Sequence, residues 1–109
     1  MLNWEDFKKV EMRVGTLLRA SAFPEARNPA FKITIDMGDL GILKTSAQIT
    51  QLYDIDELVG KQVIAVVNFP RKQIANFMSE CLILGVLGDD SDVTLLTPDK
   101  PVKNGSLIG

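Results

Sequence analysis

The sequence predicts an all-β protein, a small barrel of five principal strands with a short helix at its N-terminus. Two observations support this fold class. Segments with period-two alternation or with dense branched apolar residues recur along the chain, whereas helical periodicity is scarce. The 109 residues suffice for one hydrophobic core, so we expect a single domain over residues 1–109.

The N-terminal segment NWEDFKKVEM predicts the short helix. Asn3 stands in the capping position, acidic residues occupy the first turn, and Trp4 and Phe7 share one face. These two aromatic side chains have two interpretations: they contact a second subunit, or they cover the open end of their own barrel.

The first two strands follow the helix. Residues 11–23 form a long strand, in which Gly15 predicts a bulge or a bend. One face of this strand carries its apolar positions: Met12, Val14, Leu18 and Ala20. Residues 31–38 alternate strictly and predict a strand with one apolar face. That face consists of Phe31, Ile33, Ile35 and Met37.

Three more strands complete the barrel. Residues 42–49 predict the third strand, and the segment DIDEL before Gly60 predicts one short helical turn. Residues 61–69 and 80–88 are nearly continuous apolar runs, which is typical of central strands. The C-terminal segment from Leu96 reads as a loop with a tight turn at Asn104-Gly105.

Five strands, a bend in the first and a helical turn between the third and the fourth are typical of a barrel of the oligonucleotide/oligosaccharide-binding (OB) type. Other five-stranded barrels fit the same pattern.

Composition argues against catalysis and against a metal site. The chain has no histidine, which removes the commonest general base and the commonest metal ligand. Cys81 is its one cysteine, and its apolar surroundings predict a buried structural thiol. No glycine loop suited to phosphate binding is present, so we expect no cofactor and no nucleotide-driven cycle.

The sequence also predicts a cytoplasmic location. The first dozen residues carry charges throughout and lack the apolar core of a signal peptide. Apolar stretches such as residues 63–67 are far shorter than the ~20 residues of a membrane helix, so we expect no membrane insertion.

The cations cluster although the formal net charge is −2. No acidic residue lies between Glu57 and Glu80, a span that includes Arg71 and Lys72. If the barrel brings residues 27–32, 44–48 and 68–79 together, a positive face results, and such a face binds phosphates in a salt-sensitive way. The other interpretation of these cations is an ordinary solvated surface.

The stretch from Asn68 to Glu80, which we expect to be a loop, combines these cations with uncharged polar groups suited to base edges and riboses. It also contains three large apolar residues: Phe69, Phe77 and Met78. These three residues either plug the end of the barrel or stack on bases and grip apolar peptide side chains.

Five segments resemble a known family: VGTLLRA, DLGILKTSAQIT, LVGKQVIAVVNFP, KQIANFMSECLILG and PVKNG. They are similar to the tRNA-binding domain family, in the branch of the CsaA-type export-related chaperones. The resemblance covers residues 4–107 and implies an OB barrel, a homodimer and no catalytic chemistry. It further implies two activities, the binding of unfolded or pre-secretory polypeptides and the binding of tRNA.

From the resemblance and the charge distribution we expect three sets of site residues. The expected nucleic-acid contacts are Arg27, Lys32, Lys44, Ser46, Gln48, Asn68, Arg71, Lys72, Met78 and Ser79. The expected peptide contacts are Phe69, Phe77 and Met78. The expected dimer contacts are Trp4 and Phe7. The leading functional hypothesis is an ATP-independent, chaperone-like homodimer that also binds tRNA. The alternative is a dedicated tRNA-binding module that assists aminoacylation or tRNA folding in trans.

Overall fold

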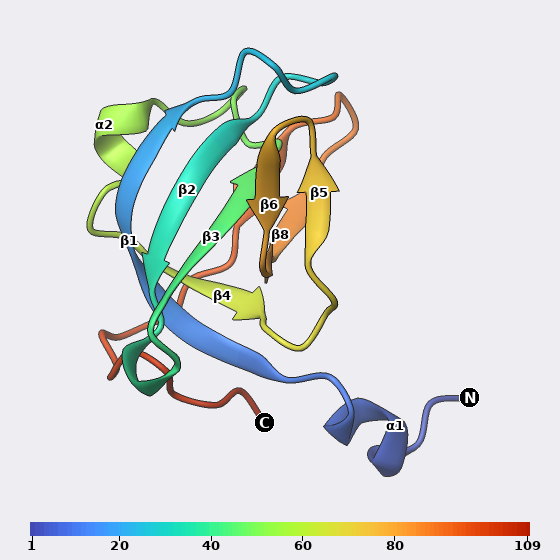
Figure 1. Ribbon diagram of the computed structural model, residues 1–109. Coiled ribbons are helices and arrows are strands. Elements are labelled where there is room, and N and C mark those ends of the chain that lie inside the picture. The colour runs from blue at the N-terminus through green and yellow to red at the C-terminus, as the bar shows by residue number, and fades with distance from the viewer.

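A computed structural model describes all residues from 1 to 109 (Figure 1). Its elements are α1 (Trp4–Lys8), β1 (Met12–Ala22), β2 (Phe31–Asp36), the 3₁₀ turn η1 (Gly38–Leu40), β3 (Ile42–Ala47), α2 (Ile55–Leu58), β4 (Gln62–Val66), β5 (Lys72–Ile74), β6 (Phe77–Ser79), β7 (Leu82–Ile83), β8 (Gly85–Leu87) and β9 (Val93–Leu95). Five strands form one antiparallel sheet in the order β3-β2-β1-β4-β7. The predicted five-stranded, OB-like barrel is thereby confirmed.

The sheet curls until its two edges almost meet. Strand β1 pairs with β4 along its first half and with β2 along its second half, so this long strand belongs to both sides of the curved sheet. On the opposite side, the backbone N–H of Glu80 donates to the carbonyl of Lys44 over 2.7 Å. The barrel is therefore nearly closed, and the chain that leads into β7 lies beside β3.

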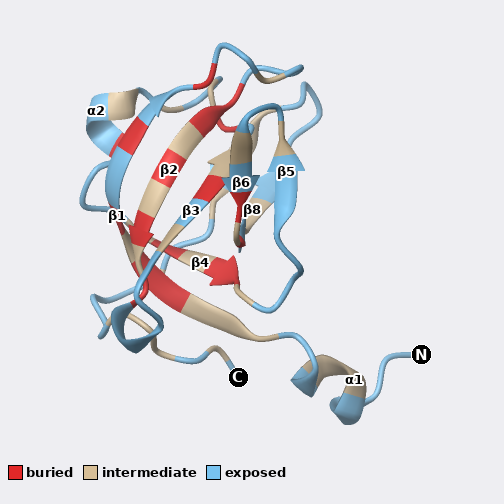
Figure 2. Cartoon of the chain, in the orientation of Figure 1, coloured by how far each residue is buried: buried red, intermediate tan, exposed pale blue.

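The core lies inside this curl, where the inward faces of the strands supply the buried side chains (Figure 2). Strand β2 alternates as predicted, with Phe31, Ile33 and Ile35 buried and the residues between them half-buried. Leu58 from the predicted helical turn, now α2, is fully buried against the same core.

The bulge in β1 is not at Gly15. The register with β2 shifts between Leu17 and Arg19, so Leu17 is buried while Leu18, which we predicted on the apolar face, is exposed. Gly15 has a different role. A Cβ atom there would lie 2.3 Å from the Sδ of Met37, so glycine allows close packing of β1 against the buried Met37.

The apolar run from residue 80 to 88 is not one central strand. It divides into β7 and β8, and β8 pairs with β9, a strand that the sequence pattern did not reveal. Val86 and Leu87 are exposed because β8 leaves the barrel to form this hairpin. Apolar composition alone therefore overestimated the burial of this segment.

The stretch predicted as a loop contains a second hairpin, β5–β6. Its turn has two residues, Ala75 and Asn76, and Ala75 has a positive φ of 53°. Glycine or asparagine usually occupies such a position, so an alanine there gave no turn signal.

Helix α1 begins as predicted, with the side chain of Asn3 accepting from the N–H of Asp6 over 2.9 Å. It projects away from the barrel (Figure 1) and buries none of its residues. Trp4 is 78% exposed and contacts Phe7 edge to face, with ring centroids 6.5 Å apart. The two aromatic rings therefore do not cover the end of their own barrel. Neither helix is long and apolar enough to cross a bilayer.

Candidate functional site

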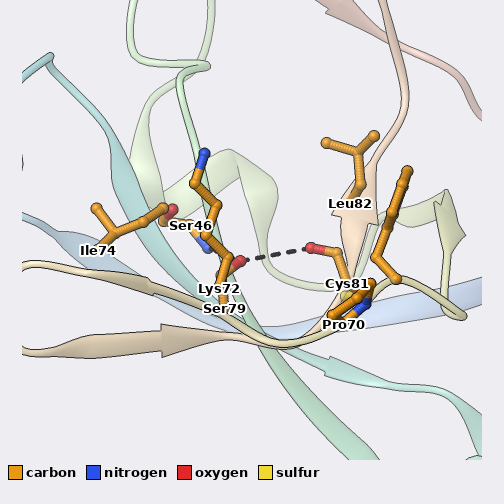
Figure 3. Close-up of a pocket in the computed structure, with 8 residues that line it drawn as sticks. Ser46, Pro70, Lys72, Ile74, Ser79, Cys81 and Leu82 are labelled. Carbon is orange, nitrogen blue, oxygen red and sulfur yellow. Dashed lines mark hydrogen bonds between the residues drawn. The ribbon is translucent and has the colours of Figure 1, made fainter.

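Two adjoining cavities lie between the β5–β6 hairpin and strand β3. The first, which we call the apolar pocket, has a volume of about 310 Å³ (Figure 3). It is lined by Ser46, Phe69, Pro70, Lys72, Ile74, Ser79, Cys81 and Leu82. The second, which we call the polar groove, has a volume of about 460 Å³. It is lined by Ala26, Arg27, Asn28, Ala30, Ser46, Gln48, Lys72, Gln73 and Ile74.

The two cavities share Ser46, Lys72 and Ile74, so they form one continuous surface. Most of its lining comes from the three segments that the sequence analysis expected to converge, residues 27–32, 44–48 and 68–79, and Ala26, Cys81 and Leu82 complete it.

A buried network of hydroxyl groups holds the hairpin against β3. The hydroxyl of Thr45, which is fully buried, donates to the carbonyl of Cys81 over 2.6 Å and lies 3.0 Å from the hydroxyl of Ser79. The Ser79 hydroxyl in turn accepts the N–H of Ser46 at 3.4 Å. Because it is buried and bonded, Ser79 builds the wall of the pocket and presents little surface to a ligand.

Lys72 is the cation at the centre of the surface. Its exposed side chain rises from β5 and lines both cavities (Figure 3). Arg27, at the far side of the polar groove, and Lys44, on β3, are also exposed. None of these three cations forms an ion pair with a carboxylate, so their charges are available to a phosphate.

Arg71 and Lys32 are already engaged. The guanidinium of Arg71 lies 3.2 Å from the carboxylate of Glu80, whose other oxygen accepts the N–H of Lys44 at 2.9 Å. The ammonium of Lys32 stands 5.4 Å above the ring of Phe23. The sequence analysis overlooked this role of Glu80, because a carboxylate at the end of an acid-free span gives no sign of folding back onto it.

Asn68 lies outside both cavities. Its side-chain amide donates to the carbonyl of Lys9 over 2.6 Å and accepts the N–H of Glu11 at 3.0 Å. Both polar ends of the amide thus fasten the segment between α1 and β1 to the end of β4. Asn68 therefore does not line either cavity with Ser46 and Lys72.

The three expected peptide contacts occupy three different places. Phe69 is 54% exposed and lines the apolar pocket. Phe77 is half-buried and packs against Phe23, with ring centroids 5.5 Å apart, so it joins the hairpin to the segment before β2. Met78 pairs with Gln73 and is exposed outside both cavities.

Leu82 and Ile74 also line the apolar pocket, although the sequence analysis did not select them. Leu82 lies in the apolar run from residue 80 to 88, which was predicted to be a buried strand. Ile74 lies in the predicted loop, where a single isoleucine did not indicate a site.

Cys81 forms part of the same wall and is buried, as predicted. The pKa of its thiol is raised from 9.0 to about 11, because burial and, to a smaller extent, the charge of Glu80 raise it by more than a hydrogen bond with Thr45 lowers it. The thiol is therefore protonated at neutral pH, which makes it a poor nucleophile.

Known proteins resemble this chain over its whole length. The family model described as "Putative tRNA binding domain" matches residues 12–107. The crystal structure of the chaperone CsaA from Bacillus anthracis is 47% identical with a TM-score of 0.96, covering 100% of this chain and 99% of that one. The CsaA chaperone protein from Picrophilus torridus is 50% identical with a TM-score of 0.93, and each chain is covered completely.

Longer proteins contain a similar segment. A methionine–tRNA ligase from Methanoregula boonei is 37% identical over 108 residues, which is 99% of this chain and 16% of that protein. The chain thus spans less than one fifth of the length of the methionine–tRNA ligases that it matches. The family match, the two CsaA structures and the OB-like barrel agree, and the chain belongs to the tRNA-binding domain family, as a CsaA-type member.

Proposed function

We propose that this protein is a non-catalytic binding protein that captures extended apolar polypeptide segments and tRNA on one shared surface. The observation that carries the proposal is the position of Lys72, a free cation at the junction of a polar groove and an apolar pocket. Such a junction suits ligands that carry both charged and apolar parts.

The polar groove fits a nucleic-acid backbone. Arg27 and Lys72 offer two unpaired charges, and Gln48, Asn28 and Gln73 offer donors and acceptors for riboses and base edges. The family match supports tRNA as the nucleic acid. With few free cations, binding is weak at physiological salt.

The apolar pocket fits the side chains of an unfolded polypeptide. Phe69, Ile74 and Leu82 border an opening that is large enough for apolar side chains, and 54% of Phe69 remains in contact with water. The similarity to the two CsaA chaperones supports unfolded polypeptides as clients. We further propose that these clients include pre-secretory polypeptides and that they are bound in the cytoplasm without ATP.

A homodimer completes the proposal. The projecting helix α1 carries the exposed Trp4, and Leu107 nearby is 62% exposed. A second copy of the chain would bury this apolar surface and present two binding surfaces, so that avidity strengthens individually weak contacts.

Charge and apolar substitutions separate the two activities. Lys72→Gln combined with Arg27→Gln removes two phosphate contacts, and we expect tRNA binding to weaken about tenfold at low salt and to become less salt-dependent. Binding of reduced, carboxymethylated α-lactalbumin, a permanently unfolded chain, should change little. Phe69→Ser should weaken binding of the unfolded chain and leave tRNA binding nearly unchanged.

Fluorescence anisotropy with labelled tRNA and labelled unfolded chain measures both activities. Lys100→Gln combined with Lys103→Gln removes the same charge outside both cavities and is the matched control. If neither the double variant nor Phe69→Ser changes either affinity, the surface is wrongly assigned.

A dedicated tRNA-binding module is the second candidate, favoured by the similarity to a segment of methionine–tRNA ligases. It predicts that tRNA binds tightly to the wild-type protein while unfolded chains do not bind at all.

A further inference from the structure

The hairpin β5–β6 leaves one strand edge free. Its two-residue turn makes Ile74 and Phe77 the closing pair, followed by Gln73 with Met78 and Lys72 with Ser79. In an antiparallel hairpin the closing pair exchanges both backbone hydrogen bonds, and the next pair exchanges none. The backbone N–H and C=O of Gln73 therefore point away from β6.

No strand of this chain occupies that edge. Strand β6 lies beside β3, whereas β5 pairs with β6 alone and stands at the rim of the molecule (Figure 1). Neither backbone group of Gln73 forms a hydrogen bond outside the hairpin, and its side-chain amide donates to the carbonyl of Ala75 in the hairpin turn. All three residues of β5 line the polar groove, and Gln73 is exposed.

We propose that an extended segment of unfolded polypeptide pairs with the free edge of β5 as an added strand. The proposal rests on the function proposed above and specifies how the client is held. The N–H and C=O of Gln73 offer one donor and one acceptor side by side, which is the complement of a peptide backbone. The phosphate groups of RNA have acceptors but no donors, so in RNA only a ribose 2′-hydroxyl or a base could donate to the carbonyl of Gln73.

Strand addition also explains how the apolar pocket is used. Lys72 and Ile74 lie on the same face of β5 and line the apolar pocket, because successive side chains of a strand alternate, whereas Gln73 lines the polar groove alone. In an added strand every second side chain lies on the cavity side, next to Ile74 and the opening bordered by Leu82. Main-chain hydrogen bonds supply affinity without reading the sequence, and the pocket selects for apolar character at alternate positions.

The edge can be tested by one substitution that removes its donor. Gln73→Pro deletes the outward N–H, and proline is tolerated at an edge position whose N–H faces solvent. Gln73→Ala is the matched control because it shortens the same side chain and keeps the N–H. The probe is a short labelled peptide of alternating valine and threonine, and the measurement is its Kd by fluorescence anisotropy.

Both variants lose the side-chain amide of Gln73, and only the proline variant also loses the N–H. We expect Gln73→Pro to bind the peptide about tenfold more weakly than Gln73→Ala, as for the loss of one hydrogen bond with its partner left unpaired. Circular dichroism and urea unfolding establish that the proline variant is folded. If Gln73→Pro is folded and binds the peptide with the Kd of Gln73→Ala, the strand-addition proposal is overturned.

A second measurement uses the wild-type protein, so it does not depend on the folding of any variant. Saturating peptide should slow the exchange of the Gln73 amide hydrogen, measured by NMR, because that amide becomes hydrogen-bonded. Unchanged exchange in the saturated complex contradicts strand addition and leaves the pocket as the peptide site. If the wild-type protein binds neither this peptide nor unfolded α-lactalbumin, the proposed function itself fails. Loss of tRNA binding in Gln73→Pro with unchanged peptide binding would assign the edge to nucleic acid.

Discussion

The guanidinium of Arg71 and the carboxylate of Glu80 face each other at 3.2 Å across the base of the β5–β6 hairpin. Arg71 is largely exposed, whereas the Glu80 side chain is only 16% exposed and is fixed by the N–H of Lys44. The pair places a carboxylate in contact with a cation that lies beside the candidate ligand surface.

Glu80→Gln should therefore strengthen RNA binding. The amide keeps an oxygen for the N–H of Lys44 and removes the charge that neutralises Arg71. We expect tRNA affinity at low salt to rise several-fold, and the slope of log K against log salt to become steeper by about 0.7 to 1, as for one additional phosphate contact. Anisotropy titrations at several salt concentrations provide the slope, and Glu57→Gln on α2 is the control for net charge. A slope that stays at the wild-type value would mean that Arg71 does not reach the RNA.

Trp4→Ser should shift the protein from dimer to monomer. Trp4 is 78% exposed on a helix that projects from the barrel, so its removal leaves the fold of one subunit intact while deleting apolar area from the proposed interface. Sedimentation velocity measures the change, and Leu87→Ser, which removes a residue of 83% exposure on β8, is the control. A wild-type protein that sediments as a monomer at high concentration would refute the dimer.

Thr45→Val should lower the free energy of unfolding by about 2 kcal/mol, because it leaves the Ser79 hydroxyl and the Cys81 carbonyl without their buried partner. Thr34→Val is the control: Thr34 lies half-buried on the outer side of β2, where such a change is expected to stay within about 0.5 kcal/mol. Urea unfolding of the three proteins gives the values. Equal losses for both substitutions would show that the hydroxyl network contributes nothing specific.

Stability should fall in alkaline solution because of Cys81. Burial raises the pKa of this thiol from 9.0 to about 11, so folding favours the protonated form. The contribution is fully present below pH 9 and is lost as the pH rises through 11. The total loss in the free energy of unfolding is about 2–3 kcal/mol. Urea unfolding across this range, compared with Cys81→Ala, isolates the effect because other titrating groups are common to both proteins. Parallel pH profiles for the two proteins would contradict it.

Several features of the fold follow directly from local sequence. The strict alternation of residues 31–37 predicted β2 and its buried face, and Asn3 predicted the start of α1. These predictions were accurate because a period-two pattern and a helix cap are local properties of the chain. The failures began where a segment changed its partner: β1 shifts register at Leu17, and the run after Cys81 leaves the barrel to pair with β9.

The sequence by itself determined the barrel, the absence of histidine chemistry and the three segments that carry the candidate ligand contacts. Only the tertiary structure decided which of those residues remain exposed at the candidate surface. Asn68, Phe77 and Ser79 are chemically suited to binding, yet they form hydrogen bonds or packing contacts with other residues of the chain. Lys72 and Phe69 remain exposed at the surface. The physical reason is that a side chain's availability depends on which distant residues, such as Lys9, Phe23 and Thr45, the fold places against it.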